Sequence, residues 1–141
     1  DHHKVDVKVV ASSTNKKPFV GDLYVRIPQY KIVGGLVFTE LSLSYLKTWG
    51  RHWFHKVPLM LRYIYQHADH DPQFKDYSSF VVVSERLPLE INSYAQSFSG
   101  AVIESINGKK VHSFAQFAKM TTNPKATSTH FEKRCRVDQQ P

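Results

Sequence analysis

Hydrophobic and polar residues alternate most regularly between Ala101 and Met120, near the C-terminal end of the chain. Residues 102–106 alternate with a period of two, which predicts a strand with one buried side. Asn107-Gly108 follows, and this dipeptide suits a type I′ hairpin turn because both of its central residues need a positive φ. Residues 109–111 then return along the hairpin as a short second strand.

A capped helix is predicted directly after this hairpin. Ser113 and Gln116 have the spacing of a capping box, in which each side chain satisfies a backbone N–H at the start of the helix. Hydrophobic side chains then recur at helical spacing and give the helix one apolar stripe, formed by Phe114, Phe117 and Ala118. Pro124 ends the helix, because the residue before a proline is pushed out of the α region.

The same periodicities assign elements to the rest of the chain. Strands are expected at 5–10, 80–85 and 127–137, a short extended piece at 23–27, and helices at 42–50, 57–67 and 87–94. The strand at 80–85 begins with a continuous apolar run, which is typical of a central strand buried on both faces. On the helix at 57–67, the expected apolar face consists of Leu61, Ile64 and Tyr65. The pattern therefore predicts an α+β fold that is mainly β.

Two adjacent glycines, Gly34 and Gly35, interrupt the strand pattern of residues 30–41. One interpretation is a tight turn that leads into a core strand, and it explains both glycines without a ligand. The other is an anion nest, in which the backbone N–H groups of residues 33–36 point outward toward a peptide carboxylate. The glycines alone favour the turn and leave the nest open.

Composition and charge limit the class of protein that this chain can be, but they do not identify its function. The chain has 141 residues, of which 41% are hydrophobic, and this suits one globular domain. Its formal charge of +7 would attract nucleic acid, acidic lipid or an acidic protein surface, but the basic residues occur as scattered pairs. No apolar run is long enough for a membrane span. Because the first residue is Asp1 rather than methionine, we expect a piece of a longer protein.

Residues that would support catalysis or metal binding are sparse. His52 and His55, and likewise His67 and His70, have a His-x-x-His spacing that could place two ligands near one metal, but polar turns also explain them. Cys135 is the only cysteine, which excludes an internal disulfide and a cysteine-rich zinc cluster. Nucleophile elbows, phosphate-binding glycine loops and paired carboxylates do not occur. We therefore expect no cofactor, no metal and no enzymatic activity from this chain alone.

Aromatic and basic residues are interleaved between residues 49 and 65. Such a mixture can stack on unpaired nucleotides. It can equally pack helices against a sheet while the charged groups extend into solvent. We favour the interpretation that these aromatic residues pack helices against a sheet, because the apolar residues recur at helical spacing.

Two stretches resemble PDZ domains. Residues 100–117, GAVIESINGKKVHSFAQF, resemble the strand–turn–helix signature in which a (D/A)-V-I-x-x-(I/V)-N-G-x-x-V run leads into the groove helix. Residues 34–41, GGLVFTEL, look like the carboxylate-binding loop and groove strand of protease-associated PDZ domains. In the order and spacing of its elements, nearly the whole chain is similar to the second, C-terminal PDZ-like domain of Deg/HtrA serine proteases, especially the eukaryotic, plant-type members.

This resemblance implies a single permuted PDZ-like domain over residues 1–141, with a helical insertion at 42–75. Its fold would be a small, strongly bent β-sandwich or open barrel flanked by three or four helices. A bound peptide would lie between a groove strand and a groove helix as an added strand. The resemblance assigns the carboxylate-facing amides to Gly34, Gly35 and Leu36, the ladder to Val37, Phe38 and Thr39, and one wall of the groove to Phe114, Phe117 and Ala118.

Three functions remain open at this point. The first is a non-catalytic module that assembles and regulates a serine endopeptidase, a hydrolase of protein quality control whose catalytic domain is absent here. Its protein partners would be the protease domain and sister subunits of a homo-oligomer, contacted through Trp49, Trp53 and Phe54. The second is recognition of C-terminal peptide tails by strand addition. The third, which the scattered charges favour least, is nucleic-acid binding. The family resemblance favours a chloroplast, mitochondrial or nuclear location.

Overall fold

The structure is a computed structural model that describes residues 29–90, 99–122 and 131–134. The strands expected at 5–10 and 23–27 lie outside the described residues. So does the second half of the helix expected at 87–94; of its described residues, Leu87 to Leu89 are not helical and Glu90 is in a 3-10 conformation. Of the strand expected at 127–137, the structure describes a short central part.

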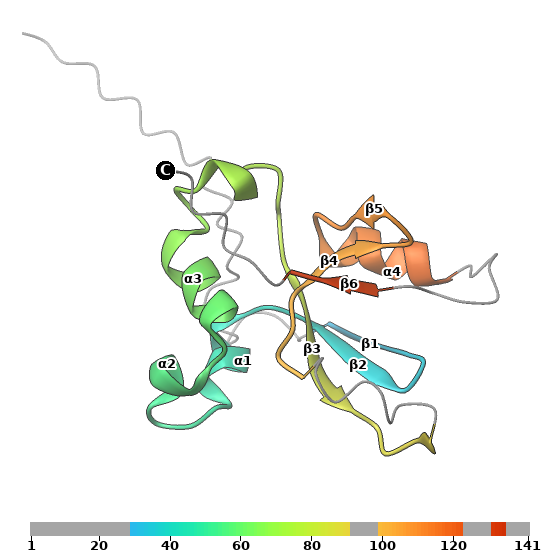
Figure 1. The fold of residues 1–141 in the computed structure, drawn as a ribbon, viewed down its shortest axis with the longest axis horizontal. Helices are drawn as coiled ribbons and strands as arrows, with labels where there is room; N and C mark the ends of the chain where they lie inside the picture. The colour runs from blue at the N-terminus through green and yellow to red at the C-terminus, as the bar shows by residue number, and fades with distance from the viewer. Residues whose placement is uncertain (1–28, 91–98, 123–130, 135–141) are drawn as a thin grey trace, which may run out of the picture.

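In the part of the chain that the structure describes, six strands form two small antiparallel sheets (Figure 1). The first sheet has the order β1-β2-β3, formed by Tyr30–Val33, Leu36–Glu40 and Val81–Arg86. The second has the order β5-β4-β6, formed by Lys109–Lys110, Ile103–Ile106 and Phe131–Lys133. An antiparallel bridge between Val82 and Val102 joins the two sheets. With the helices described next, this arrangement confirms the predicted α+β, PDZ-like fold.

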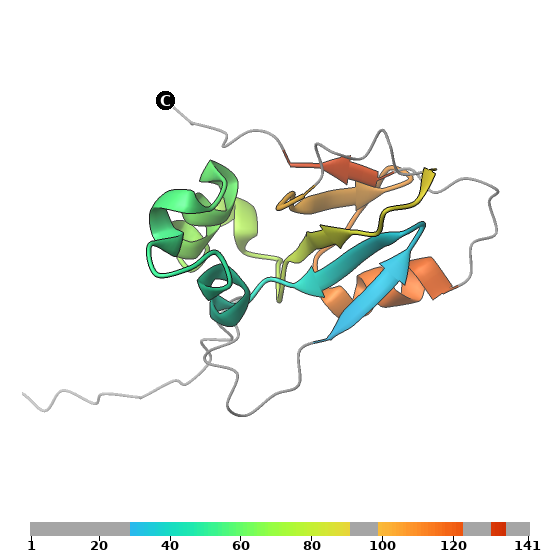
Figure 2. The same cartoon turned by 90° about the horizontal axis from the view of Figure 1, so that it is seen from below.

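The helices lie in two places. Three of them, together with a short 3-10 turn, gather at one end of the sheets (Figure 1): α1 at Leu43–Lys47, α2 at Trp53–Lys56, α3 at Leu59–His67 and η1 at Pro72–Phe74. We call residues 42–75 the helical segment. The fourth helix, α4 at Phe114–Thr122, lies beside the β1–β2 hairpin in the view of Figure 2. Local sequence explains these positions, because Ser42 caps α1 by accepting a hydrogen bond from Tyr45 N, and Pro58 precedes α3.

Strand β3 separates two hydrophobic cores. Phe80 and Val82 pack with α1, α3 and η1 in the first core, whereas Val81 and Val83 pack with β2, β4 and α4 in the second. All four side chains are buried, at 1% exposure or less. The continuous apolar run at the start of this strand therefore reflects burial on both faces, as the sequence predicts. Its second edge is also paired, since Val83 N donates to Ala101 O at 2.9 Å.

The hairpin and helix predicted between Ala101 and Met120 are confirmed. Asn107 and Gly108 form the turn with φ values of 50° and 78°. Ser113 Oγ accepts a hydrogen bond from Gln116 N at 3.1 Å, and Gln116 Oε1 accepts one from His112 N at 2.9 Å. The second bond reaches one residue further back than in a standard capping box.

Two sequence expectations about the helical segment are wrong in detail. On α3, Leu61 and Ile64 are fully buried, but Tyr65 is 40% exposed and lies outside the apolar face. Its ring instead lies edge-on against Trp53, with the centroids 5.1 Å apart. Helix α2 was not expected, because four residues are too few to show a helical period.

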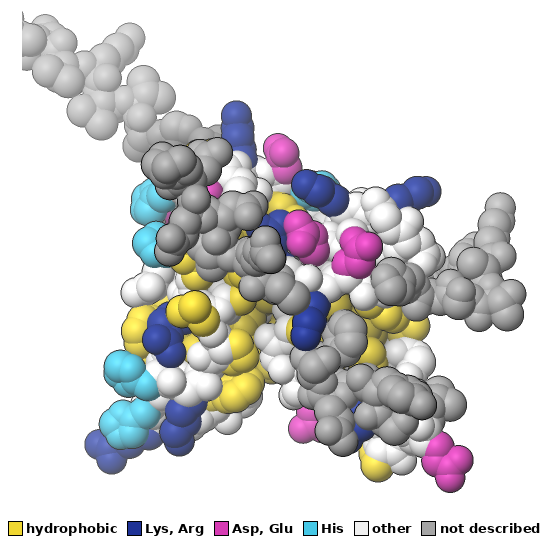
Figure 3. All heavy atoms as spheres, in the orientation of Figure 1, with side chains coloured by type: hydrophobic (Ala, Val, Ile, Leu, Met, Phe, Trp, Pro, Cys, Tyr) yellow, Lys and Arg dark blue, Asp and Glu magenta, His cyan; other side chains and the backbone are white. Residues whose placement is uncertain are grey.

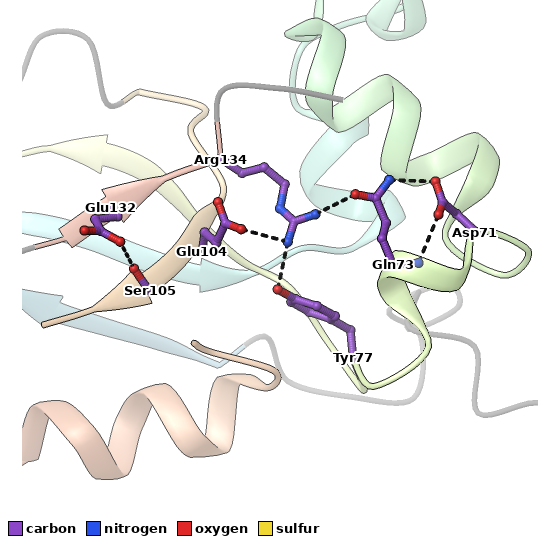
Figure 4. A network of polar contacts seen from close by, with 7 residues as sticks. All are labelled: Asp71, Gln73, Tyr77, Glu104, Ser105, Glu132 and Arg134. Atoms are coloured by element: carbon purple, nitrogen blue, oxygen red, sulfur yellow. Dashed lines mark hydrogen bonds and ion pairs between the residues drawn. The ribbon is translucent and has the colours of Figure 1, made fainter. Parts of the chain in front are cut away.

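A largely buried arginine, Arg134, ties the helical segment to the second sheet. Arg134 donates to Gln73 Oε1 at 3.1 Å and to Tyr77 OH at 2.9 Å, and it lies 3.3 Å from Glu104 Oε1 (Figure 4). Its guanidinium carbon is 5.1 Å from the centre of the Phe74 ring. Because Gln73 and Phe74 belong to η1 and Glu104 belongs to β4, one side chain links both parts of the molecule.

Candidate protein-binding site

The two glycines of residues 30–41 form a tight turn. Gly34 and Gly35 have φ values of 57° and 77°, which is the positive pair that a type I′ turn requires. They connect β1 to β2 as an antiparallel hairpin in which Val33 faces Leu36 and Lys31 faces Phe38. Gly35 O also accepts a hydrogen bond from Leu87 N at 2.8 Å. The turn interpretation is therefore confirmed.

Strand β2 is paired along both of its edges. On one side it pairs with β1, and on the other it pairs with β3 through a bulge at Val37 and Phe38. Ser84 Oγ donates to Val37 O at 3.1 Å near this bulge. A peptide that binds by strand addition needs an exposed strand edge. In this chain the edge of β2 that faces away from β3 carries β1, which runs antiparallel to β2.

Strand β1 is attached to the predicted groove helix as well as to β2. Lys31 Nζ donates to Ala118 O and to Thr122 Oγ1, both at 2.8 Å. Val33 packs against the second core, so that Lys31 and Val33 point inward. Tyr30 and Ile32 alternate with them and are 69% and 51% exposed. The strand thus lies on β2 and is held to α4 through its inward face.

The residues predicted to form the groove wall are part of the core. Phe117 is fully buried and Phe114 is 5% exposed. The ring centroid of Phe117 lies 4.7 Å from that of Phe38, which in turn lies 5.1 Å from that of Phe131. Ala118 is half-buried, and its carbonyl accepts the Lys31 bond. The structure therefore brings α4 and β2 together as predicted, but their aromatic side chains fill the interior between them.

The second candidate surface lies on the helical segment. Trp49 and Trp53 are partly buried against the first core. Phe54 lies edge-on to Trp53 with the centroids 5.7 Å apart, and Arg62 covers the Phe54 ring at 5.3 Å. Arg62 is one of the basic residues that the sequence interleaves with these aromatic ones, but the predicted contact surface did not include it.

The His67–Asp71 stretch, whose residue types could also bind a metal, takes part in local structure. Asp71 accepts hydrogen bonds from Tyr63 OH and from Gln73 N, and the Tyr63 ring lies 4.6 Å from that of His67. Burial by itself would raise the pKa of Asp71, but the hydrogen bonds from Tyr63 and Gln73 outweigh it and hold this pKa below its ordinary value. Among the residues that the structure describes, no three His, Cys, Asp or Glu side chains are grouped to hold a metal ion.

Comparison with known proteins identifies the family. The family model of the PDZ domain matches residues 21–138, which is most of the chain. The chain therefore belongs to the PDZ domain family, a family of protein–protein interaction modules that are not catalytic by themselves. No curated protein matches the sequence. Within the described ranges, no helix is both long and apolar enough to cross a bilayer.

Proposed function

We propose that this PDZ domain assembles and regulates a Deg/HtrA-type serine endopeptidase by contacting protease subunits, and that it does so without taking up free peptide tails. The observation that carries this proposal is the pairing of β2 with β1 and β3 along both edges. A peptide that adds to β2 would first have to displace β1. It would also have to break the bonds from Lys31 to α4.

The contact surface in this proposal is the aromatic cluster of the helical segment. Trp53 and Phe54 remain partly exposed although they pack in edge-to-face contacts. Partly exposed tryptophan and phenylalanine that are already held in place lose little conformational entropy on binding, which is why aromatic residues dominate interface hot spots. The cluster lies at the end of the molecule away from β5 and α4 (Figure 1).

The proposal is tested in the full-length protease that contains this domain. We expect Trp53→Ala to shift the oligomer distribution toward smaller species in size-exclusion chromatography with light scattering. Leu89→Ala is the matched control, since Leu89 is also an exposed hydrophobic residue, at 48% exposure, outside the helical segment. An unchanged distribution for Trp53→Ala, with the domain still folded, would refute this contact surface.

A second candidate, recognition of C-terminal tails, is favoured by one observation. Strand β1 has only four residues, and two of them are largely exposed, so its displacement would break few contacts. Fluorescence polarisation with a library of labelled C-terminal peptides separates the two functions. Micromolar binders that are lost in Gly35→Asp but kept in Gly108→Asp, the same change in the other type I′ turn, would favour tail recognition. The absence of binders would favour assembly.

A further inference from the structure

Basic residues are concentrated on the helical segment. Residues 42–70 contain four Lys and Arg residues and a single acidic residue, Asp69: the basic residues are Lys47, Arg51, Lys56 and Arg62. The same stretch holds four histidines, at 52, 55, 67 and 70. Helix α3 has nine residues, which places Asp69 roughly 15 Å from the first residue of the helix. Within residues 42–70, no acidic residue therefore lies close to the turn before α2 or to the start of α3 in the sequence.

The charges at this end of the segment are available to a partner. Arg51 and Lys56 are exposed, and neither makes a hydrogen bond or ion pair with any part of the chain that the structure describes. Figure 3 shows Lys, Arg and His side chains beside hydrophobic ones over α1 to α3, at the lower left of that view. Solvent-exposed cations without a local counter-charge create a positive potential that attracts acidic groups.

Hydrophobic side chains lie among these charges. Leu59, the first residue of α3, is 70% exposed, and Tyr65 on the same helix is 40% exposed. Arg62 lies between them in sequence, where it donates to His55 O at 3.3 Å and covers the ring of Phe54. Exposed large apolar residues next to unpaired cations are the combination that a partner with both acidic and apolar side chains would match.

We propose that this face, formed by Arg51, Lys56, Leu59, Arg62 and the Trp53–Phe54 pair, docks an acidic protein segment that carries at least one large apolar side chain. The inference rests on the proposed function, since it names the chemistry of the partner at the same surface. A protein is favoured over nucleic acid because the aromatic rings already make contacts within the chain that restrict stacking on them. Arg62 covers one face of Phe54, and Trp53 is in edge contact with Phe54 and Tyr65, at interplanar angles of 79° and 90°. Bases need free ring faces to stack on.

A membrane surface is disfavoured by the same packing. Trp53 is packed against the first core, and insertion into a bilayer would require its ring to leave that contact. Among the described residues of the helical segment, Leu59 is the most exposed apolar side chain, and one leucine gives weak anchoring.

The test measures binding of the 141-residue chain to a fluorescein-labelled decapeptide that contains six glutamates around one phenylalanine and one leucine. We expect the double variant Arg51→Glu/Lys56→Glu to weaken binding about tenfold or more, and affinity to fall between 50 and 200 mM salt by about threefold or more, as expected for exposed charge pairs. Lys109→Glu/Lys110→Glu makes the same charge change on the exposed strand β5 and should change affinity less than about twofold.

Three results would overturn the inference: no binding of the acidic peptide at millimolar concentration, equal weakening by both double variants, or tighter binding to phosphatidylserine vesicles or single-stranded DNA than to the peptide. The full-length protease separates this failure from failure of the proposed function. If Trp53→Ala shifts the oligomer distribution and Arg51→Glu/Lys56→Glu does not, the surface is correct and the acidic partner is wrong. If neither variant shifts it, both are wrong.

Discussion

Replacing Lys31 by methionine should loosen the contact that holds β1 to α4. The side chain donates one partly buried hydrogen bond to Ala118 O and one exposed bond to Thr122 Oγ1. A hydrogen bond from a charged donor contributes about 1.5–3 kcal/mol when buried, and exposure reduces this to about 1 kcal/mol for the pair. The lysine also lies near the C-terminal end of α4, where a cation adds about 0.3–1 kcal/mol. Methionine keeps the apolar stem, so we expect a total loss of about 1.3–2 kcal/mol.

Urea denaturation of the 141-residue chain, followed by tryptophan fluorescence, measures this loss. With an m value of about 1–3 kcal/mol/M, the midpoint should fall by roughly 0.4–2 M. Lys109→Met is the matched control, because Lys109 is exposed on β5 and should change stability by less than about 0.5 kcal/mol. Equal midpoints for Lys31→Met and Lys109→Met would show that the Lys31 contact does not hold β1.

Three further predictions concern stability. Arg134→Met should lower the free energy of unfolding by about 2–4 kcal/mol in the same urea assay, because it leaves Glu104 without its cation and removes two further hydrogen bonds. Tyr77→Phe removes only one of these hydrogen bonds and should lower it by about 1 kcal/mol. Because the pKa of Asp71 is lowered in the folded state, its contribution is present above pH 4 and lost as pH falls further; the difference in stability between the wild type and Asp71→Asn should therefore shrink in acid. Gly34→Ala should cost about 1–2 kcal/mol, because its φ is 57° with open space around it, while Gly34→Asn should cost less since asparagine tolerates that conformation.

Local signals predicted the parts of the fold that are specified by neighbouring residues. Asn107-Gly108 predicted a hairpin because few other dipeptides readily adopt the two positive φ angles of a type I′ turn. Ser113 and Gln116 marked the start of α4. The apolar run at the start of β3 predicted burial on both faces, and each side of that strand does pack against a separate core.

Long-range pairing could not be predicted in the same way. Residues 30–33 pair with the edge of β2 on which a bound peptide would be expected, and nothing in their sequence indicates this. A type I′ turn specifies that a hairpin forms, but it does not specify which edge of the sheet the hairpin covers. The burial of Phe117 against Phe38, rather than exposure in a groove, depends on the packing of α4 across the sheet. Arg134 joins elements that are 30 to 61 residues away along the chain, and no local pattern encodes such contacts.

Amide hydrogen exchange of β1, measured by NMR on the 141-residue chain, tests the central claim that β1 closes the edge of β2. In a hairpin with a two-residue turn, the residue pair that flanks the turn is hydrogen-bonded, and every second pair after it is hydrogen-bonded as well. The N–H groups of Val33 and Lys31 therefore point to β2, while those of Tyr30 and Ile32 point away. We predict slow exchange at Lys31 and Val33, within about tenfold of Leu41, whose N–H donates to Phe80 O at 2.8 Å, and fast exchange at Ile32. Exchange of Lys31 and Val33 at the rate of an unstructured peptide, with Leu41 still protected, would show that this edge is open and would contradict the account.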